Sequence, residues 1–323
     1  MNPYIGHESQ FYGIEEHRLV GGKGDGIRLL EVNNGSGIEA TISLDRNADL
    51  ARLRFKGINL GYFSPVGYVA PAYYESKGSD WLKSFTAGFL TTCGLQSVGT
   101  PCEDAGEELP LHGSIGNTPV SSAIYFEEDD KLIIKTKTVD EFIFGRKLRL
   151  SRTYTFPIGK NFFTYSDTIE NTGDKREPVE ILYHMNMGYP LLDEDSIVKI
   201  DSEKVIARDA HAQEDIDNWM NMEKPTAGYQ ERCYYHTMKT AAGHASIFQP
   251  KLGTGVSIDY DSSSLDCFVE WKMMGVRDYV LGLECGNCYP DGRDIMRDQG
   301  ILKFLDPGKK MTYTVKISMI EEA

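Results

Sequence analysis

Residues 131–139 read KLIIKTKTV, residues 147–156 read KLRLSRTYTF, and residues 162–170 read FFTYSDTIE. All three runs are rich in β-branched and aromatic residues, and each partly alternates apolar with polar side chains. Proline and glycine in residues 157–161 end one run before the next begins, which is typical of a hairpin turn. The stretch therefore predicts consecutive antiparallel strands joined by short turns.

The same pattern continues beyond this stretch, with little sign of helix. Residues 311–318 read MTYTVKIS after a Pro-Gly turn, whereas residues 80–85 and 214–220 each allow at most two helical turns. Many evenly spaced strands with few helices predict an all-β fold, a large antiparallel β-sandwich. No repeat or long linker divides the chain, so we expect a single domain over residues 1–323.

Composition and charge exclude several classes of partner. The formal net charge is -14, with 34 basic and 48 acidic residues, which argues against binding to nucleic acid. The sequence has no apolar run of about 18 residues that could span a membrane, and its start lacks a secretory signal. Six cysteines are too few for a disulfide framework, so we expect a cytoplasmic protein.

Two histidines and a carboxylate, His112, His184 and Glu284, are candidates for proton transfer at neutral pH. His184 follows a predicted strand, where alternation places Leu182, His184 and Asn186 on one face. An unpaired buried polar group costs roughly 1–3 kcal/mol, so these groups need partners or a cavity. One interpretation is that His184 is hydrogen-bonded within the protein. The turn at residues 188–190 favours the other interpretation, in which His184 faces a ligand.

Glu284 ends an apolar predicted strand on the same face as Val280 and Gly282. A carboxylate in such a position is seldom buried without a partner or a purpose. Gly282 has no side chain there, which suits the close approach of a ligand. A salt-bridged edge glutamate is the alternative for Glu284, and an exposed loop residue is the alternative for His112.

The pattern Cys285-x-x-Cys288 lies in a strand-to-loop setting without a βαβ context. A zinc site would need a second pair of ligands, and the other cysteines are isolated. We therefore expect neither a metal nor an organic cofactor.

Several short segments, taken in order, resemble the galactose mutarotase-like superfamily, and most closely a divergent branch related to aldose 1-epimerases. The similarity extends from about Ile38 to Ile317. It rests on Asp45-Arg46, residues 54–57, residues 88–95, residues 111–113, residues 184–190, Trp271-Lys272 and residues 282–284.

The resemblance implies a large β-sandwich that binds a sugar in an open cleft. By this resemblance His184 protonates the ring oxygen and Glu284 takes the proton from the anomeric hydroxyl. Asp266 and Asp278 are candidates for the family's substrate-binding aspartate. Tyr183, where true galactose mutarotases carry asparagine, makes galactose a doubtful substrate. Further substrate contacts are expected from His112, Arg46 or Arg54, Asn186, Trp271, Lys272 and Asn287.

The sequence thus predicts an isomerase of carbohydrate metabolism that interconverts the anomers of a sugar or sugar derivative. We expect His112, His184 and Glu284 to converge on one cleft, with the side chains of His184 and Glu284 separated by about the width of a pyranose ring. The expected partner is a small-molecule carbohydrate, with neither nucleic acid nor membrane. The alternatives are a noncatalytic carbohydrate-binding protein or sensor, or a lyase or hydrolase on the same fold. A hydrolase would use two carboxylates about 5–10 Å apart, and only one is identified. The sequence indicates neither the sugar nor the oligomeric state.

Overall fold

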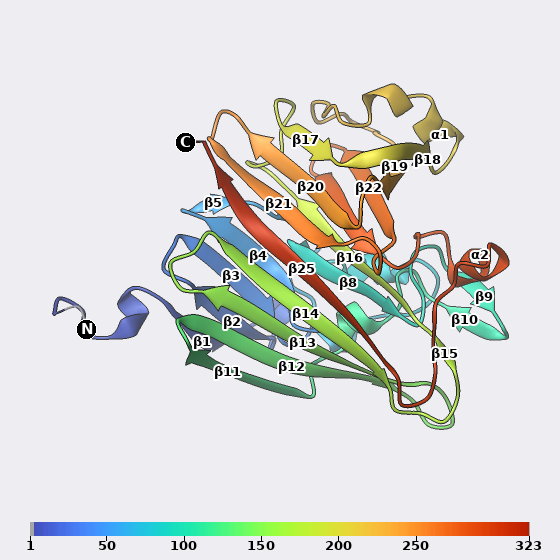
Figure 1. The fold of residues 1–323 in the computed structure, drawn as a ribbon, viewed down its shortest axis with the longest axis horizontal. Helices are drawn as coiled ribbons and strands as arrows, with labels where there is room; N and C mark the ends of the chain where they lie inside the picture. The colour runs from blue at the N-terminus through green and yellow to red at the C-terminus, as the bar shows by residue number, and fades with distance from the viewer. Residues whose placement is uncertain (1–2, 323) are drawn as a thin grey trace.

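Residues 3–322, the part of the chain that the computed structural model describes, form three large antiparallel sheets (Figure 1). The first has eight strands and contains the three consecutive antiparallel strands that the sequence predicts over residues 131–170, with residues 157–161 at the turn between the second and the third. Its strands, in spatial order, are β11 (Ser122–Glu128), β12 (Lys131–Glu141), β13 (Lys147–Pro157), β14 (Phe162–Asn171), β25 (Lys310–Glu321), β21 (Thr254–Asp261), β20 (Ala242–Gln249) and β17 (Ile197–Ile200).

The other two large sheets lie behind the eight-stranded sheet in the view of Figure 1. A six-stranded sheet consists of β18 (Ser202–Ala207), β19 (Arg232–Met238), β22 (Cys267–Met274), β23 (Tyr279–Gly286), β16 (Glu180–Met187) and β8 (Leu90–Leu95). A five-stranded sheet consists of β1 (Gly13–Arg18), β2 (Arg28–Asn33), β3 (Ile38–Ser43), β4 (Asp49–Phe55) and β5 (Ile58–Asn59). The predicted all-β antiparallel sandwich is confirmed.

Short elements connect these sheets. The two-stranded ribbons are β6 (Tyr62–Phe63) with β7 (Ala87–Gly88), β9 (Cys102–Asp104) with β10 (Glu107–Leu109), and β15 (Glu177–Pro178) with β24 (Phe304–Leu305). The α-helices are α1 (Ala210–Gln213) and α2 (Arg293–Asp298). The 3₁₀ turns are Glu8–Gln10, Gly22–Gly24, Pro71–Tyr73, Asp80–Ser84, Ile115–Asn117 and Ile216–Asn218.

The helical predictions are met only as 3₁₀ turns, at Asp80–Ser84 and Ile216–Asn218. The sequence did not predict α2, because six residues are too few to display an apolar period of 3.6. Within residues 3–322, the helices are too short or too polar for any of them to cross a membrane.

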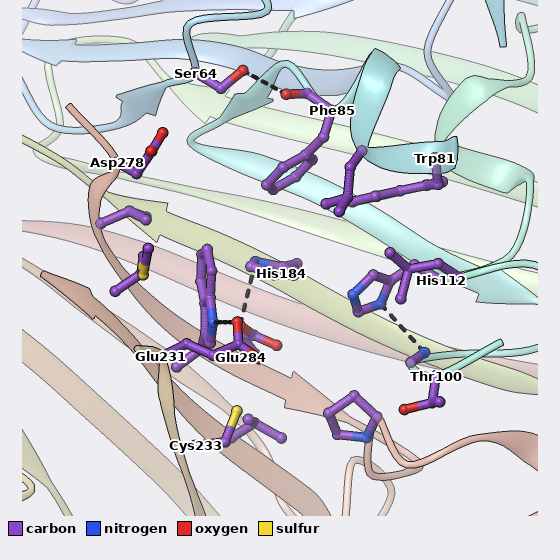
Figure 2. Close-up of a pocket in the computed structure, with 18 of the residues that line it drawn as sticks. Ser64, Trp81, Phe85, Thr100, His112, His184, Glu231, Cys233, Asp278 and Glu284 are labelled. Atoms are coloured by element: carbon purple, nitrogen blue, oxygen red, sulfur yellow. Dashed lines mark hydrogen bonds and ion pairs between the residues drawn. The ribbon is translucent and has the colours of Figure 1, made fainter. Parts of the chain in front are cut away.

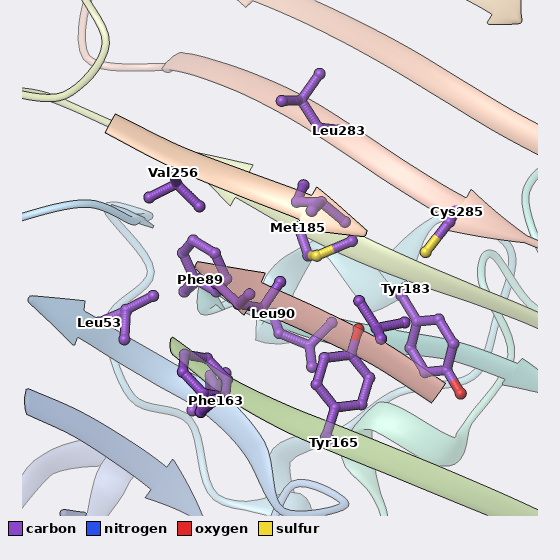
Figure 3. Packing of buried hydrophobic residues seen from close by; sticks show 14 of the residues in the cluster. Leu53, Phe89, Leu90, Phe163, Tyr165, Tyr183, Met185, Val256, Leu283 and Cys285 are labelled. Atoms are coloured by element: carbon purple, nitrogen blue, oxygen red, sulfur yellow. The ribbon is translucent and has the colours of Figure 1, made fainter. Parts of the chain in front are cut away.

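The main core lies between the eight-stranded sheet and the other two sheets. Figure 3 shows Phe163 of β14 and Val256 of β21 packed with Leu53 of β4 and Met185 of β16. All four are at most 1% exposed, so each sheet loses one apolar face from water. Along β14 every second residue is buried, which is the alternation that the sequence displays.

A guanidinium in this core joins the three sheets. Arg152 of β13 is 0% exposed and donates to Asp167 of β14 (2.7 Å) and to Asp49 of β4 (2.7 Å). It also donates to the Thr92 hydroxyl of β8 (2.7 Å). The Tyr183 hydroxyl of β16 donates to Asp167 (3.0 Å), so all three large sheets are bonded to one charged cluster.

Arg152→Ala should destabilise the protein by about 3–5 kcal/mol, because it leaves two buried carboxylates without their cation. Arg149→Ala is the matched control, since Arg149 lies on the same strand but pairs with Glu141 at the surface. The control should cost at most about 1 kcal/mol. Urea unfolding of the two variants measures both values, and similar losses would contradict the structural role of Arg152.

Candidate active site

The six-stranded sheet has a second face, turned away from the core, and this face forms the floor of a cavity of about 770 Å³. Alternation along β16 sends Tyr183 and Met185 into the main core and directs Leu182 and His184 to the opposite face. The neighbouring strand β23 pairs with β16 so that Glu284 lies directly opposite His184. The cavity floor therefore carries an imidazole beside a carboxyl group (Figure 2).

His184 and Glu284 are closer together than the sequence suggested. His184 Nδ1 lies 3.3 Å from Glu284 Oε1, and the two residues are 5% and 2% exposed. Directly paired residues of antiparallel strands have Cβ atoms only about 4.5–5.5 Å apart. The expected separation by the width of a pyranose ring is therefore wrong, although the expected convergence on one cavity with His112 is confirmed.

Gly282 makes room for the carboxyl group of Glu284. A Cβ atom at this position would lie 2.2 Å from Glu284 Oε1 and 3.1 Å from the Cβ atom of Trp271. Its missing side chain thus accommodates the protein's own carboxyl group, whereas the sequence suggested space for a ligand. Any side chain here would displace the Glu284 carboxyl group from its place beside His184.

His112 reaches the cavity from a loop with left-handed backbone geometry (φ 56°). Its ring centre lies 5.7 Å from that of His184 and 4.9 Å from that of Trp81. The backbone N–H of Gly99 donates to His112 Nδ1 (3.3 Å), which leaves the ring proton on Nε2. Burial lowers the pKa of His112 to about 4, so the ring is neutral and can donate from Nε2 at neutral pH.

Aromatic rings enclose His184. Phe85 and Trp271 lie with their ring centres 5.5 Å and 5.3 Å from the imidazole, and Trp81 stacks on Phe85 at 4.5 Å. The Trp271 Nε1–H donates to Glu231 Oε2 (2.7 Å), which holds the indole at the cavity wall. These rings restrict the rotamer of His184 and present flat apolar surfaces to the cavity.

Burial also decides the charge of the central pair. Burial raises the pKa of the Glu284 carboxyl group well above its ordinary value, and the nearby charge of Glu231 adds to this shift. Burial lowers the pKa of the His184 imidazole well below its ordinary value, and His112 adds to that shift. Both shifts favour an uncharged pair in which Glu284 carries the proton.

Five of the residues that the sequence selected are brought together in the cavity lining: His112, His184, Trp271, Asp278 and Glu284. Lys272 and Asn287 lie elsewhere. The Lys272 ammonium donates to the carbonyl oxygen of Asn221 (2.6 Å), on the face opposite Trp271. Asn287 bonds to the backbone of β16 and of the residue before it, so its amide is structural.

The predicted contacts of Arg46, Arg54 and Asn186 are likewise not supported by their positions. Arg46 is buried and donates to the carbonyl oxygen of Val69 (3.3 Å); burial lowers its pKa to about 10. Arg54 is exposed on β4, in the five-stranded sheet, and Asn186 donates to the backbone carbonyl of His184 (3.0 Å). Alternation and loop composition could not show which polar side chains face the cavity.

Several cavity residues were not selected from the sequence, because they come from separate loops and strand ends without a local signal. Of the two candidate aspartates, Asp278 lines the cavity, whereas Asp266 pairs with Lys303 (2.6 Å). The additional lining residues with polar or aromatic side chains include Tyr62, Trp81, Phe85, Arg208, Glu231 and Asp291.

The cysteines of the C-x-x-C pattern do not line the cavity. Cys285 belongs to the main core and Cys288 to the smaller cluster beneath the cavity, and burial raises the pKa of both thiols. Among residues 3–322, no group of three or more His, Cys, Asp or Glu side chains is arranged to hold a metal ion.

Comparison with solved structures places this fold among the galactose mutarotase-like β-sandwiches. The chain belongs to the family described as Domain of unknown function (DUF4432), whose model matches residues 24–319. No curated protein matches the sequence significantly.

Three solved structures illustrate the similarity. A candidate aldose 1-epimerase from Klebsiella pneumoniae is 25% identical with a TM-score of 0.90, over 98% of this chain and 86% of that one. A galactose 1-epimerase from Lactobacillus acidophilus is 14% identical (TM-score 0.66; 97% and 100% covered). A galactose mutarotase-like protein from Clostridium acetobutylicum is 16% identical (TM-score 0.66; 97% and 100% covered). The last two likenesses concern the fold alone.

Glu284→Gln should stabilise the protein increasingly as the pH rises. Because burial raises the pKa of Glu284 in the folded state above 4.5, the unfolded chain binds fewer protons above that pH, and wild-type stability falls. Glutamine has no proton to lose, so the variant's advantage should grow from pH 4.5 upward until the pH passes the folded-state pKa.

Urea unfolding between about pH 5 and pH 9 measures this advantage. Glu180→Gln is the comparison, because Glu180 is a second buried carboxyl group, on β16 but outside the cavity. Burial raises the pKa of Glu180 to about 8, so its advantage should stop growing above that pH. An advantage of Glu284→Gln that is constant with pH would contradict the raised pKa.

Proposed function

We propose that this protein interconverts the anomers of a sugar or sugar derivative by acid/base ring opening and closure. The observation that carries the proposal is the side-by-side pair of His184 and Glu284 on the floor of the cavity. A proton donor and a proton acceptor are the chemical groups that opening a hemiacetal requires. The similarity to aldose 1-epimerase folds supports the same reaction.

The short distance within the pair suits this reaction. In a cyclic sugar the ring oxygen and the anomeric hydroxyl oxygen are bonded to the same carbon, so both can approach one small region of the cavity floor. One member of the pair takes the anomeric hydroxyl proton while the other protonates the ring oxygen. The bond from the anomeric carbon to the ring oxygen breaks, and the anomeric carbon becomes a carbonyl.

Ring closure reverses these proton transfers after rotation about the bond to the carbonyl carbon. The pair gains one proton and gives one away, so it carries a single exchangeable proton before and after each ring opening. Because either member can hold that proton, Glu284 can act as the acid with His184 as the base, or the reverse. The favoured uncharged pair starts with the proton on Glu284.

The surrounding residues would orient the sugar. The His112 Nε2–H is available to donate to a sugar hydroxyl, since Nδ1 already accepts from Gly99. The rings of Phe85 and Trp271, which line the cavity, can pack against the apolar C–H surface of a sugar and exclude water from the pair. Exclusion of water strengthens the electrostatic interactions of the reacting groups.

A noncatalytic sugar-binding protein is a less satisfactory explanation of this site. His184 Nδ1 and Glu284 Oε1 are buried without a good hydrogen bond among the described residues, which costs roughly 1–3 kcal/mol for each group. A binding protein gains nothing from this cost. Proton transfer to a substrate, by contrast, requires a donor and an acceptor that are not already hydrogen-bonded within the protein. A hydrolase is the second candidate, because it would use two carboxyl groups. The cavity lining adds Glu231, Asp278 and Asp291 to Glu284, the carboxyl group that the sequence identified.

Glu284→Gln should retain sugar binding but lower the rate of anomer exchange by roughly 10²-fold or more, because it preserves shape and removes the exchangeable proton. His184→Asn should behave in the same way. NMR exchange spectroscopy or polarimetry on a panel of aldoses, ketoses and their derivatives measures the exchange, and calorimetry measures the binding.

Glu180→Gln is the matched control, since it alters a buried carboxyl group on the strand of His184 without touching the cavity. It should exchange anomers at close to the wild-type rate. A wild-type protein that binds sugars but is inert on the whole panel would refute the enzyme and favour a binding protein.

The exchange rate should depend on pH with two limbs that enclose a broad plateau. The acidic limb reports a second proton entering the pair; because burial lowers the pKa of His184, it should lie below the ordinary imidazole value of 6.5. The alkaline limb reports loss of the last proton; because burial raises the pKa of Glu284, it should lie above 4.5. Initial rates across the pH range give the two apparent pKa values, which belong to the pair and not to either residue alone. A maximum confined to a narrow pH range would contradict both shifts.

A further inference from the structure

The rim of the cavity carries more negative than positive charge. Besides the uncharged Glu284 on the floor, the lining residues include three carboxyl groups, from Glu231, Asp278 and Asp291, against a single guanidinium, that of Arg208. This imbalance has the same sign as the net charge of the whole chain, which is -14. A ligand that enters the cavity therefore meets a negative potential.

The one guanidinium is already neutralised within the protein. Arg208 donates to Glu231 (2.9 Å) and lies 3.5 Å from a carboxylate oxygen of Asp209. Its other terminal nitrogen donates to the sulfur of Cys233 (3.4 Å). Arg208 is thus poorly placed to bind a phosphate or carboxylate of a ligand.

Two rim carboxylates, by contrast, have only a tyrosine as side-chain partner. The Tyr62 hydroxyl shares its proton between Asp278 (3.3 Å) and the carbonyl oxygen of Arg277 (3.2 Å), and the Tyr235 hydroxyl donates to Asp291 (2.6 Å). Among residues 3–322, neither aspartate has a cationic side chain within ion-pair distance. Each tyrosine orients its carboxylate and leaves acceptor positions and the negative charge available to a ligand.

A second feature marks this cavity as a ligand site independently of the acidic residues. His184 and Glu284 both line this cavity, and their Nδ1 and Oε1 atoms are buried without a hydrogen bond within the described chain. Figure 2 shows Asp278 on one side of His184 and His112 on the other, so the unpartnered pair lies within the space that the rim encloses.

We propose that the cavity prefers sugars that carry a positive charge, such as amino sugars, over their neutral parents, and disfavours phosphorylated and acidic sugars. Asp278 and Asp291 are the specificity-determining residues, because they supply the uncompensated charge. The proposal rests on the proposed function, which makes the ligand a sugar, and adds the charge of that sugar. Partly exposed ion pairs contribute only modestly to binding free energy, so we expect the amino sugar to bind roughly 3- to 10-fold more tightly than its neutral parent.

The test uses calorimetry with D-glucosamine, D-glucose and D-glucose 6-phosphate, and with the matching galactose series, at about pH 6, where an amine whose pKa is roughly 8 is charged. We expect binding in the order amino sugar, neutral sugar, phosphate. At about pH 9 the amine is mostly uncharged, and the preference over the neutral sugar should disappear. High salt should reduce the preference, as it does for any exposed ion pair.

The double variant Asp278→Asn/Asp291→Asn should bind the amino and neutral sugars equally. Asp266→Asn is the control, because Asp266 pairs with Lys303 outside the cavity and should leave the preference unchanged. Equal binding of amino and neutral sugars by the wild type, tighter binding of the phosphate, or a preference that survives the double variant would overturn the proposal.

Anomer exchange of the same sugars, followed by NMR, separates this proposal from the proposed function. If the expected binding order holds and no sugar exchanges faster than in buffer, the enzymatic function fails and the charge preference stands. If neutral or phosphorylated sugars exchange rapidly and amino sugars neither bind nor exchange better, the function stands and the charge preference fails.

Discussion

The buried guanidinium of Arg152 is the constraint on which the arrangement of the three sheets depends. A cation in an apolar core must be surrounded by acceptors, and Arg152 finds them on β4, β8 and β14 together. The Tyr183 hydroxyl bonds to the same cluster, and Tyr183 immediately precedes His184 on β16. The charged centre of the core therefore fixes the strand that carries the imidazole of the candidate active site.

The candidate site follows from strand register more than from loops. Because His184 and Glu284 are directly paired across β16 and β23, their side chains must lie together on one face of the sheet. Gly282 then leaves room for the carboxyl group, and the aromatic rings around His184 keep water away. A rigid sheet thus holds a carboxyl group and an imidazole in contact. Burying the two groups lowers the stability of the fold, a cost that a proton-transfer site can require.

Several residues of this site could be predicted from the sequence. His112, His184 and Glu284 stand among small and turn-forming neighbours, and their order matched a known superfamily, so they could be selected without coordinates. Trp271 and Lys272 show where that reasoning ends, because adjacent residues of a strand point to opposite faces. The sequence proposed both as substrate contacts, and the structure places only Trp271 in the cavity.

The sequence by itself determined the all-β sandwich, because alternation with a period of two and turn residues are local signals that each strand displays. It also selected His112, His184 and Glu284 as candidates for proton transfer, because few side chains can exchange protons at neutral pH. Only the tertiary structure decided the contact between His184 and Glu284, the charge of the rim and the burial that shifts the pKa values. These properties depend on register and on groups far apart in the chain, which no local pattern encodes.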